Sequence, residues 1–287
     1  MSLARNVAGI QFANPVLLAA GTAGFGREIV GVIDLTRLGG LVTKAVSLSP
    51  RAGNRAPRVA ELAGGMLNSI GLANPGVEHV AADDLPWLRA NAPSLPVIVN
   101  VVGFTTREYA NVIETIDHLD AHAAYELNLS CPNTSAGGVE FGADAASLAE
   151  VISGCRRATR RPLFAKLSPV LPNIAAMARA AVDAGADGIT LVNTMPGSAY
   201  DGAEPRLGNG FGGLSGPALL PVGLLAVSRT ASALPGVPII GVGGISRAEH
   251  VRDYLRAGAA LVAIGTAALA DPRLPERLIA ELESTDG

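Results

Sequence analysis

Cysteine is scarce in this chain of 287 residues, because Cys131 and Cys155 are the only two. Two cysteines cannot build a disulfide framework, a four-cysteine metal site or an iron–sulfur cluster. The longest nearly apolar run, residues 257–270, spans only 14 residues and is too short for a membrane helix. The N-terminus shows no basic stretch followed by an apolar core, so no signal peptide is expected. We therefore expect a cytoplasmic protein in a reducing compartment, without membrane attachment.

An excess of positive charge is also lacking. The net charge is −3 and the pI is about 5.8, which gives no electrostatic reason to expect nucleic acid. Hydrophobic residues make up 49% of the chain and charged residues 16%, a composition typical of a globular α/β protein with many buried strands. The length would allow two domains, but α/β barrels of this size commonly form one. We predict a single domain, residues 1–287.

Lysine is the third scarce residue. Only Lys44 and Lys166 are lysines among 22 basic residues, and both lie in apolar, strand-like segments, residues 41–45 and 163–167. Lysine is almost never fully buried without a partner, and its compact charge has a tunable pKa. The two positions therefore indicate functional lysines. The alternative is a buried ion pair at each site.

Short apolar segments alternate with helical patterns eight times. This alternation predicts an α/β protein with the (β/α)8 TIM barrel fold. The predicted strands are residues 14–21, 39–46, 96–103, 124–130, 162–168, 187–194, 238–243 and 260–266. The predicted helices are residues 27–38, 76–91, 106–121, 144–159, 172–184, 217–233, 246–257 and 272–283. A doubly wound sheet is the alternative, but residues 21–26 read G-x-x-G-x-G, which matches its G-x-G-x-x-G fingerprint poorly.

Polar residues and glycines gather where the predicted strands end. Function in such barrels collects at the C-terminal ends of the strands. In chain order these ends carry Gly21 and Thr22, Lys44, Asn100, Asn128 with Cys131, Lys166, Asn193 with Thr194, Gly243 with Gly244, and Gly265 with Thr266. Each lysine and asparagine at residues 44, 100, 166 and 193 shares a strand face with an apolar residue two positions earlier. We therefore expect an active site above an apolar barrel layer.

The segment 124–142 carries the greatest density of reactive and hydrogen-bonding groups. Its apolar residues alternate up to residue 130, and Pro132 then ends the strand because proline has no N–H to donate. Asn128, Cys131 and Asn133 therefore stand at the strand's tip. A lone cysteine is often only a small buried hydrophobe. Its place among the other polar strand ends favours a reactive thiol here.

Two insertions lengthen loops at the same predicted end of the barrel. Residues 48–75 include Asn68, Ser69, Ile70, Gly71 and Leu72, whose glycine and amides suit close contact with a flat ligand. Residues 195–215 are rich in glycine and weakly patterned, as an active-site lid would be. Surface decoration is the alternative for both insertions.

Glycine motifs follow the seventh and eighth predicted strands, where these barrels usually bind phosphate. They are Gly-Val-Gly-Gly-Ile-Ser at 241–246, with Ser246 and Glu249 at capping-box spacing, and Ala-Ile-Gly-Thr at 263–266. Gly216, just before a helix-starting proline, adds another. A sugar phosphate or flavin mononucleotide (FMN) would suit such a site, and the amide side chains match the imide edge of a flavin or pyrimidine. A Schiff-base lyase and a non-catalytic phosphate-binding barrel remain alternatives.

Four segments resemble a known family: Asn-Leu-Ser-Cys-Pro-Asn at 128–133, Val-Thr-Lys-Ala at 42–45, Asn-Ser-Ile-Gly-Leu-Ala-Asn-Pro-Gly at 68–76, and Gly-Gly-Leu-Ser-Gly-Pro at 212–217. The chain resembles class 1 dihydroorotate dehydrogenases over essentially its whole length, most of all the class 1B catalytic subunit. This resemblance implies oxidation of (S)-dihydroorotate to orotate in pyrimidine biosynthesis, with Cys131 as base and FMN as hydride acceptor. It also implies a homodimer joined by an FAD and [2Fe-2S] subunit in a heterotetramer that passes electrons to NAD. A homodimeric, fumarate-linked class 1A enzyme is the alternative.

The resemblance also implies site residues, and no metal. Those expected to contact FMN are Gly21, Lys44, Ala45, Asn100, Asn128, Lys166, Val192, Gly216, Gly243, Gly244, Gly265 and Thr266. Those expected to contact substrate are Lys44, Asn68, Ser69, Ile70, Gly71, Leu72, Asn128, Asn133, Asn193 and Thr194. Lys166 is expected beside N1 and the C2 carbonyl of the flavin, where negative charge develops on reduction.

Overall fold

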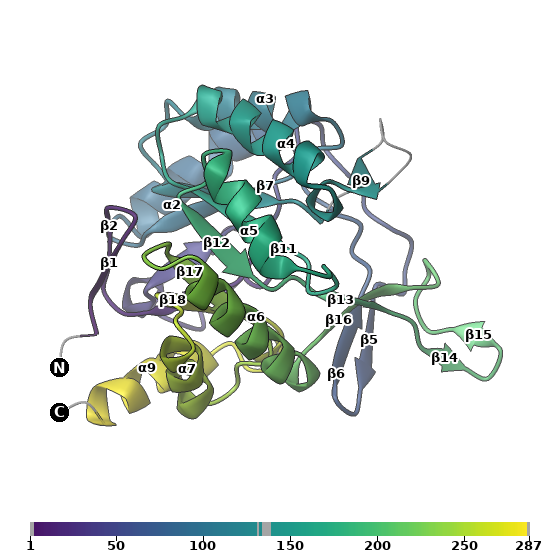
Figure 1. Ribbon diagram of the computed structural model, residues 1–287. Coiled ribbons are helices and arrows are strands. Elements are labelled where there is room, and N and C mark those ends of the chain that lie inside the picture. The colour runs from purple at the N-terminus through teal and green to yellow at the C-terminus, as the bar shows by residue number, and fades with distance from the viewer. Residues whose placement is uncertain (1–2, 131, 134–138, 286–287) are drawn as a thin grey trace.

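The computed structural model describes residues 3–130, 132–133 and 139–285 of the chain, and within them eight parallel strands close into a barrel (Figure 1). The strands pair in the order in which they occur along the chain. They are β3 Val16–Leu18, β4 Gly40–Val42, β7 Val97–Val101, β8 Ala124–Asn128, β11 Leu163–Leu167, β12 Gly188–Leu191, β17 Ile239–Val242 and β18 Leu261–Ile264. The predicted (β/α)8 barrel is confirmed, although each strand is shorter than expected.

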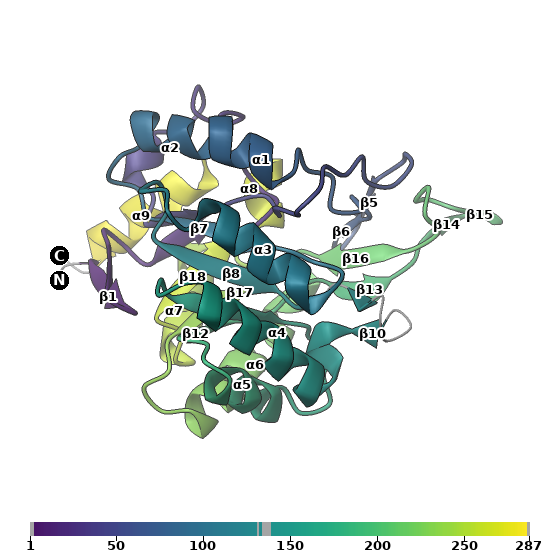
Figure 2. The same ribbon diagram turned by 90° about the horizontal axis from the view of Figure 1, so that it is seen from above.

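Alternate residues of the strands fill the barrel interior. Leu17, Val42, Ile98, Phe164 and Ile240 belong to one buried cluster, which also takes in side chains from β1 (Arg5–Val7) and β2 (Ile10–Phe12). The β1–β2 hairpin thus closes the end at which the strands begin, opposite an additional sheet formed by β5 (Val59–Leu62), β6 (Gly65–Asn68), β13 (Met195–Gly197) and β16 (Gly212–Ser215) (Figures 1 and 2). The other end, where the strands finish, is called the C-terminal end of the barrel below.

Helices pack on the outward faces of the strands (Figure 2). They are α1 Val77–His79, α2 Leu85–Asn91, α3 Thr106–Ile116, α4 Ala145–Ala158, α5 Ile174–Asp183, α6 Leu220–Ala233, α7 Ala248–Arg256, α8 Thr266–Ala270 and α9 Leu274–Thr285. The π-helical turn η2 Val80–Asp84 joins α1 to α2, and the 3-10 turns are η1 Leu35–Arg37, η4 Phe141–Ala143 and η5 Pro217–Leu219. In α3, Thr105 caps the N-terminus by accepting from the Glu108 N–H, while Tyr109, Val112 and Ile116 point into the core.

The first predicted helix, residues 27–38, is wrong. The structure has separate turns there, followed by η1. Isolated helical hydrogen bonds occur, such as Val30 N to Gly26 O, but they do not continue into a helix. Gly26 and Gly31 and the β-branched residues between them all lower helix propensity, so the short turns are favoured. The short helix α8, just after the last barrel strand, was not predicted.

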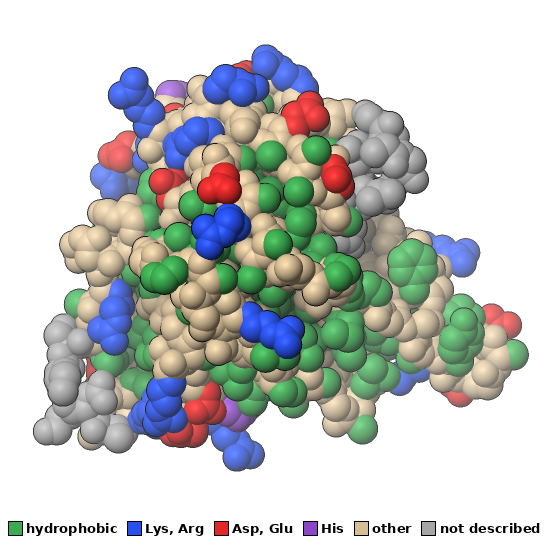
Figure 3. Space-filling view, viewed as in Figure 1, with side chains coloured by type: hydrophobic (Ala, Val, Ile, Leu, Met, Phe, Trp, Pro, Cys, Tyr) green, Lys and Arg blue, Asp and Glu red, His purple; other side chains and the backbone are tan. Residues whose placement is uncertain are grey.

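The two insertions form one four-stranded antiparallel sheet in the order β13-β16-β6-β5. Its strands are β5 Val59–Leu62, β6 Gly65–Asn68, β13 Met195–Gly197 and β16 Gly212–Ser215. Residues 195–215 are therefore partly strand rather than an unpatterned lid. Beyond them projects the hairpin of β14 Tyr200–Asp201 and β15 Glu204–Pro205, on which exposed hydrophobic side chains are visible (Figure 3). Tyr200 is 64% exposed.

No helix among the described residues is both long enough and apolar enough to cross a membrane.

Candidate active site

A layer of polar side chains lies above the apolar barrel interior, on four adjacent strands. Register pairs Asn100 of β7 with Glu126 of β8, and pairs Lys166 of β11 with both Asn128 of β8 and Thr190 of β12. Each has the same strand parity as the interior residue two positions before it, such as Ile98 or Phe164. Their side chains therefore face the inside of the barrel, near its C-terminal end.

Lys166 and Glu126 form a buried ion pair within this layer. Lys166 Nζ lies 3.3 Å from Glu126 Oε1, and the same oxygen accepts a 2.7 Å hydrogen bond from Asn100 Nδ2. The two charged side chains are only 8% and 1% exposed. The ion-pair alternative considered for the lysines is thus present at Lys166. The pair does not exclude a functional role, because an ammonium group has three donors.

Two further polar atoms in this layer have no protein partner. Asn100 Oδ1 and Thr190 Oγ1 are buried and make no hydrogen bond with any residue that the structure describes. Buried polar atoms are nearly always satisfied, so these two are candidate contacts for an ordered water or a polar ligand.

Glu126 was missed as a site residue, although it shares a strand face with Asn128 two positions later. From the sequence alone, a glutamate at that position does not reveal whether it points into the site or to the surface. The side chain that neutralises it, Lys166, lies 40 positions away. Only the pairing of β8 with β11 brings the two together.

Lys44 lies two residues after the end of β4 and has a different environment. Its backbone N–H donates to Gly24 O at 2.8 Å, and its side chain is half-buried. Its ammonium group forms no ion pair with any residue in the described ranges. A half-buried cation without a counter-ion at the C-terminal end of the barrel favours an anionic ligand. Ala45, the next residue, is also half-buried.

Asn128 and Asn193 form an amide pair at the ends of β8 and β12. Asn193 Nδ2 donates to Asn128 Oδ1 at 3.2 Å, and Asn193 Oδ1 accepts from the Thr194 N–H at 2.8 Å. Tyr109 Oη anchors this region by donating to Asn128 O at 2.7 Å. The structure therefore brings three of the predicted substrate residues together.

The predicted substrate residues 68–72 lie at the end of β6 and in the loop after it, which is held by polar contacts. Asn68 Nδ2 donates to Gly213 O at 3.3 Å, which ties this loop to the second insertion. Ser69 Oγ accepts from Asn54 Nδ2 at 2.9 Å. Gly71 and Leu72 both have positive φ, +71° and +58°. Ile70 lies between these tethered residues and is half-buried.

Asn74 is a second residue that the sequence analysis missed. Its Nδ2 donates to Ser47 Oγ at 2.8 Å and to Leu72 O at 2.7 Å, while its Oδ1 accepts from the Gly76 N–H at 2.9 Å. Asn74 is buried and positions the loop rather than contacting a ligand. Its place inside the 68–76 motif was the only signal for it.

Backbone N–H groups are available after β17 and β18. Those of Gly243, Gly244, Gly265 and Thr266 donate to no acceptor among the described residues. A Cβ at Gly265 or at Gly21 would meet open space or only distant atoms, so both backbones can be approached closely. Gly216, by contrast, lies against Gly65, since a Cβ there would come within 2.7 Å of the Gly65 Cα. Val192 is buried, and its N–H donates to Val242 O.

The predicted capping box at Ser246 and Glu249 is wrong. Arg247 is the N-cap of α7, without a side-chain cap bond, so Ser246 lies one residue too early. Glu249 instead pairs with Arg252 at 3.3 Å, one turn along the helix, and with Arg256 at 2.7 Å, two turns along it. These nearby guanidinium groups lower the pKa of the Glu249 carboxyl.

The predicted catalytic residue Cys131 lies outside the described residues. Asn133 is described in its backbone only, as part of β9 (Pro132–Asn133), which pairs with β10 (Val139–Glu140). Cys155 is buried in α4, where burial raises the pKa of its thiol to about 12. It is therefore no candidate for a reactive thiolate.

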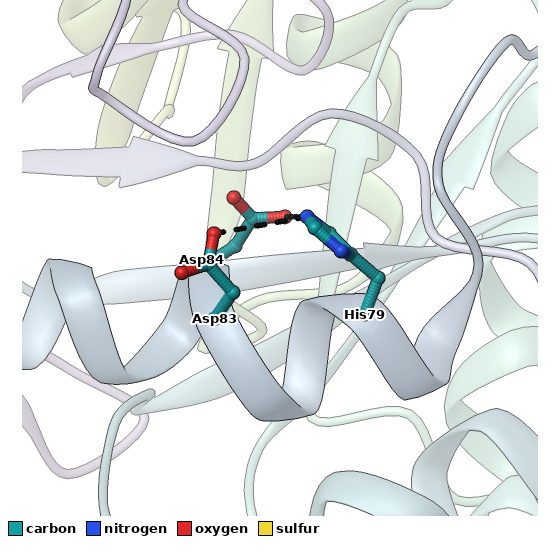
Figure 4. A group of neighbouring side chains, drawn as sticks. All are labelled: His79, Asp83 and Asp84. Atoms are coloured by element: carbon teal, nitrogen blue, oxygen red, sulfur yellow. Dashed lines mark ion pairs between the residues drawn. The ribbon is translucent and has the colours of Figure 1, made fainter.

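A separate cluster of titratable side chains lies on the helical turns before α2 (Figure 4). His79 Nε2 lies 3.7 Å from Asp83 Oδ2 and 3.8 Å from Asp84 Oδ2. Arg27 Nη2 already pairs with Asp83 at 2.9 Å, and its guanidinium stacks over Trp87. Arg27 also lies 3.8 Å from Asp84 Oδ1, so one guanidinium offsets part of the charge of both carboxylates. The cluster is therefore an ion-pair network that fastens the loop after β3 to these turns.

Fold and site together define a (β/α)8 barrel whose C-terminal end carries lysines, amides and available backbone N–H groups. The model of the dihydroorotate dehydrogenase family matches residues 2–285. The chain is 44% identical to the dihydroorotate dehydrogenase B (NAD(+)) catalytic subunit of Pelobacter propionicus, covering 97% of this chain and 91% of that protein. It is 46% identical to the subunit so named from Desulforudis audaxviator, with 96% and 90% coverage, and 45% identical to that from Anoxybacillus flavithermus, with 98% and 89%.

The chain therefore belongs to the dihydroorotate dehydrogenase family, and the resemblance found in the sequence is confirmed.

Proposed function

We propose that this chain is the catalytic subunit of an FMN-dependent dihydroorotate dehydrogenase, which oxidises (S)-dihydroorotate to orotate in pyrimidine biosynthesis. The observation that carries the proposal is the arrangement at the C-terminal end of the barrel. There a buried Lys166–Glu126–Asn100 network stands beside the Asn128–Asn193 amide pair, and the strands β17 and β18 end in backbone N–H groups that have no acceptor in the described part of the chain. Family membership and the names of the relatives support the same activity.

The residues present fit FMN. Gly243, Gly244, Gly265 and Thr266 would hold the phosphate through their N–H groups, because anions bind well to several converging amides. Asn100 Oδ1, which has no partner among the described residues, would accept from the ring system. The remaining proposed contacts are Gly21, Lys44, Ala45, Asn128, Lys166, Val192 and Gly216.

The proposed substrate contacts combine one cation with several amides. Lys44 would neutralise the carboxylate of dihydroorotate, since it forms no ion pair with any residue in the described ranges. Asn128 and Asn193 would bind the amide edges of the ring, with Asn68, Asn133 and Thr194. Residues 69–72 would approach the ring from the loop after β6, where Gly71 allows close contact.

The reaction removes a proton from C5 of dihydroorotate and a hydride from C6. FMN, when bound, accepts the hydride. We assign proton removal to Cys131, whose thiolate form the positive charge of Lys44 would stabilise. The amide residues orient the ring so that both transfers proceed from one bound geometry. Lys166 is buried with its partner Glu126, so water does not screen its ammonium group and a bound ring would meet the two charges together.

We also propose the assembly that the class 1B relatives suggest, with residues 1–287 acting as one domain. Their names describe catalytic subunits of an NAD-linked enzyme, which implies a partner subunit. The proposed assembly is a cytoplasmic heterotetramer, in which a homodimer of this chain binds a subunit carrying FAD and a [2Fe-2S] cluster. That subunit would pass the electrons to NAD. This chain has two cysteines, too few for such a cluster of its own.

The visible spectrum of the purified chain tests the proposal most directly. We expect two flavin absorption bands that bleach when dihydroorotate is added without oxygen, with one orotate formed per flavin reduced. A colourless protein that borohydride inactivates at Lys44 or Lys166 in the presence of substrate would indicate a Schiff-base lyase instead. A protein that binds FMN but is not reduced by dihydroorotate would refute the proposed substrate.

A further inference from the structure

We infer that Tyr254 is a positioning residue for the proposed FMN phosphate site. It holds the peptide between Gly243 and Gly244 so that the Gly244 N–H points away from the helical layer and is free to bind the phosphate. This inference rests on the proposed function, because it assumes that a phosphate binds there. Tyr254 itself touches neither cofactor nor substrate and acts through the backbone after β17.

Tyr254 reaches the strand end from the helical layer. It lies on α7, is fully buried, and directs its hydroxyl toward two consecutive carbonyl groups. Tyr254 Oη lies 2.8 Å from Gly243 O and 3.1 Å from Val242 O, so it donates to one or shares its hydrogen between both. Burial raises the pKa of the tyrosine, so the hydroxyl keeps its proton and remains a donor.

These contacts also fix the direction of the neighbouring N–H groups, because the peptide unit is planar. In a trans peptide the C=O and the following N–H point in opposite directions. Holding Gly243 O toward Tyr254, in the helical layer, directs the Gly244 N–H away from that layer. Val242 O is held in the same way, and it also accepts from the Val192 N–H at 3.0 Å, which fixes the Gly243 N–H. Neither N–H has an acceptor among the described residues, as expected for donors reserved for a ligand.

The surrounding sequence makes room for this tyrosine at two glycines. A Cβ at Gly223 in α6 would overlap the Tyr254 hydroxyl, and a Cβ at Gly241 in β17 would overlap its ring. A glycine inside a helix or strand is destabilising by roughly 0.5–1 kcal/mol relative to alanine. The space is therefore kept at a cost in stability. The hydroxyl that fills it lies within hydrogen-bonding distance of the two carbonyls that set the direction of the phosphate-binding N–H groups.

The experiment compares FMN with riboflavin, which has the same ring system but no phosphate. Flavin-free wild type and Tyr254→Phe are titrated with each flavin. In Tyr254→Phe we expect the affinity for FMN to fall about tenfold, the effect of roughly one well-placed hydrogen bond. The affinity for riboflavin should stay unchanged, so the preference for FMN shrinks. An equal loss for both flavins would show that Tyr254 is only structural and would overturn the inference, as would no loss for either.

The matched control is Tyr125→Phe. Tyr125 is equally buried, and its replacement also removes one hydrogen bond, from the hydroxyl to Asp117 Oδ1 at 3.0 Å. Tyr125 lies on the helix-facing side of β8 and makes no hydrogen bond with the backbone after β17 in the described part of the chain. Its substitution should leave the FMN preference at the wild-type value. A wild type that binds neither flavin would reject the proposed function, and the inference with it. A wild type that prefers FMN, with an unchanged preference in Tyr254→Phe, would reject the inference alone.

A measurement on the wild type makes the test independent of how the variant folds. With 15N-glycine labelling, the Gly244 amide signal should shift downfield and exchange more slowly with FMN than with riboflavin, because only FMN carries the phosphate oxygens that would accept from this N–H. An identical Gly244 signal in the two complexes would contradict the inferred direction of this N–H.

Discussion

The ammonium group of Lys166 lies 3.3 Å from the carboxylate of Glu126 inside the barrel, and Asn100 donates to the same carboxylate oxygen. The lysine is therefore half of a buried pair and not an isolated cation. Charge that develops on a bound flavin ring would meet this pair as a whole. The pairing also predicts how the protein responds when either partner is removed.

Glu126→Gln should lower the free energy of unfolding of the flavin-free protein by about 3 kcal/mol, because it leaves a buried ammonium group without its counter-ion. Urea unfolding measures the change. The additional substitution Lys166→Met should recover part of the loss, since it removes the unpaired charge. Glu114→Gln is the control, because Glu114 pairs with Arg107 at the exposed surface and should matter little. A Glu126→Gln protein as stable as wild type would show that the pair does not form.

Because His122 is buried, we expect the free energy of unfolding to fall at mildly acidic pH. It is buried against Tyr125, and both its ring nitrogens lack partners among the described residues. Burial lowers its pKa from 6.5 to about 4. Between pH 6.5 and pH 4, His122 is therefore protonated in the unfolded chain but largely neutral in the folded protein. This contribution is complete above pH 6.5 and is lost as the pH falls toward 4, up to about 3 kcal/mol in all.

His122→Phe should remove this part of the pH dependence while keeping the aromatic contact. The difference in unfolding free energy between variant and wild type, followed from pH 7 to pH 4, isolates it from the carboxyl groups. The exposed His118 four residues earlier serves as control, and His118→Phe should keep the wild-type slope. Parallel curves for His122→Phe and wild type would contradict the prediction.

Gly213→Ala should weaken substrate binding without removing FMN. A Cβ at Gly213 would overlap the side chain of Thr194, a proposed substrate contact. We expect the KM for dihydroorotate to rise about tenfold or more, because the displaced threonine no longer fits the ring. Flavin content should stay normal. Gly64→Ala, in the turn of the same additional sheet, meets no atoms within 4 Å and should behave as wild type.

Cys131→Ala should retain FMN, because we assign the thiol to proton removal and not to cofactor binding. Anaerobic flavin reduction by dihydroorotate should slow by a factor on the order of 10² or more in a stopped-flow measurement. Cys155→Ala is the control, and its buried thiol should be dispensable for the reaction. Flavin reduction at the wild-type rate in Cys131→Ala would assign the base to another residue.

The isolated chain should oxidise dihydroorotate with artificial dyes but reduce NAD only weakly, because its two cysteines cannot carry an iron–sulfur cluster to relay electrons. Co-expression with a subunit carrying FAD and a [2Fe-2S] cluster should restore NAD reduction, and the two should copurify. Rapid turnover of the lone homodimer with fumarate, without any such partner, would place the chain in class 1A.

Much of the fold and of the site's location was predictable from local sequence patterns. Period-two alternation marked the barrel strands and placed Lys44, Asn100, Asn128 and Lys166 at their C-terminal ends. Such signals extend over only a few residues, which is why the existence of the strands was right and their boundaries were not. The helix predicted at 27–38 failed for the same reason, since a plausible apolar pattern there does not outweigh its glycines.

What the sequence by itself determined is therefore the repeating β-α order and which side chains reach one end of the barrel. The tertiary structure alone decided their partners. Glu126 meets Lys166 only because β8 pairs with β11, and the two insertions form one sheet only because β6 pairs with β16. Tyr254 lies beneath Gly243 because two glycines far apart in the chain open a space for it. Local conformational preferences set each element, whereas contacts between distant residues are fixed by packing, which no short segment encodes.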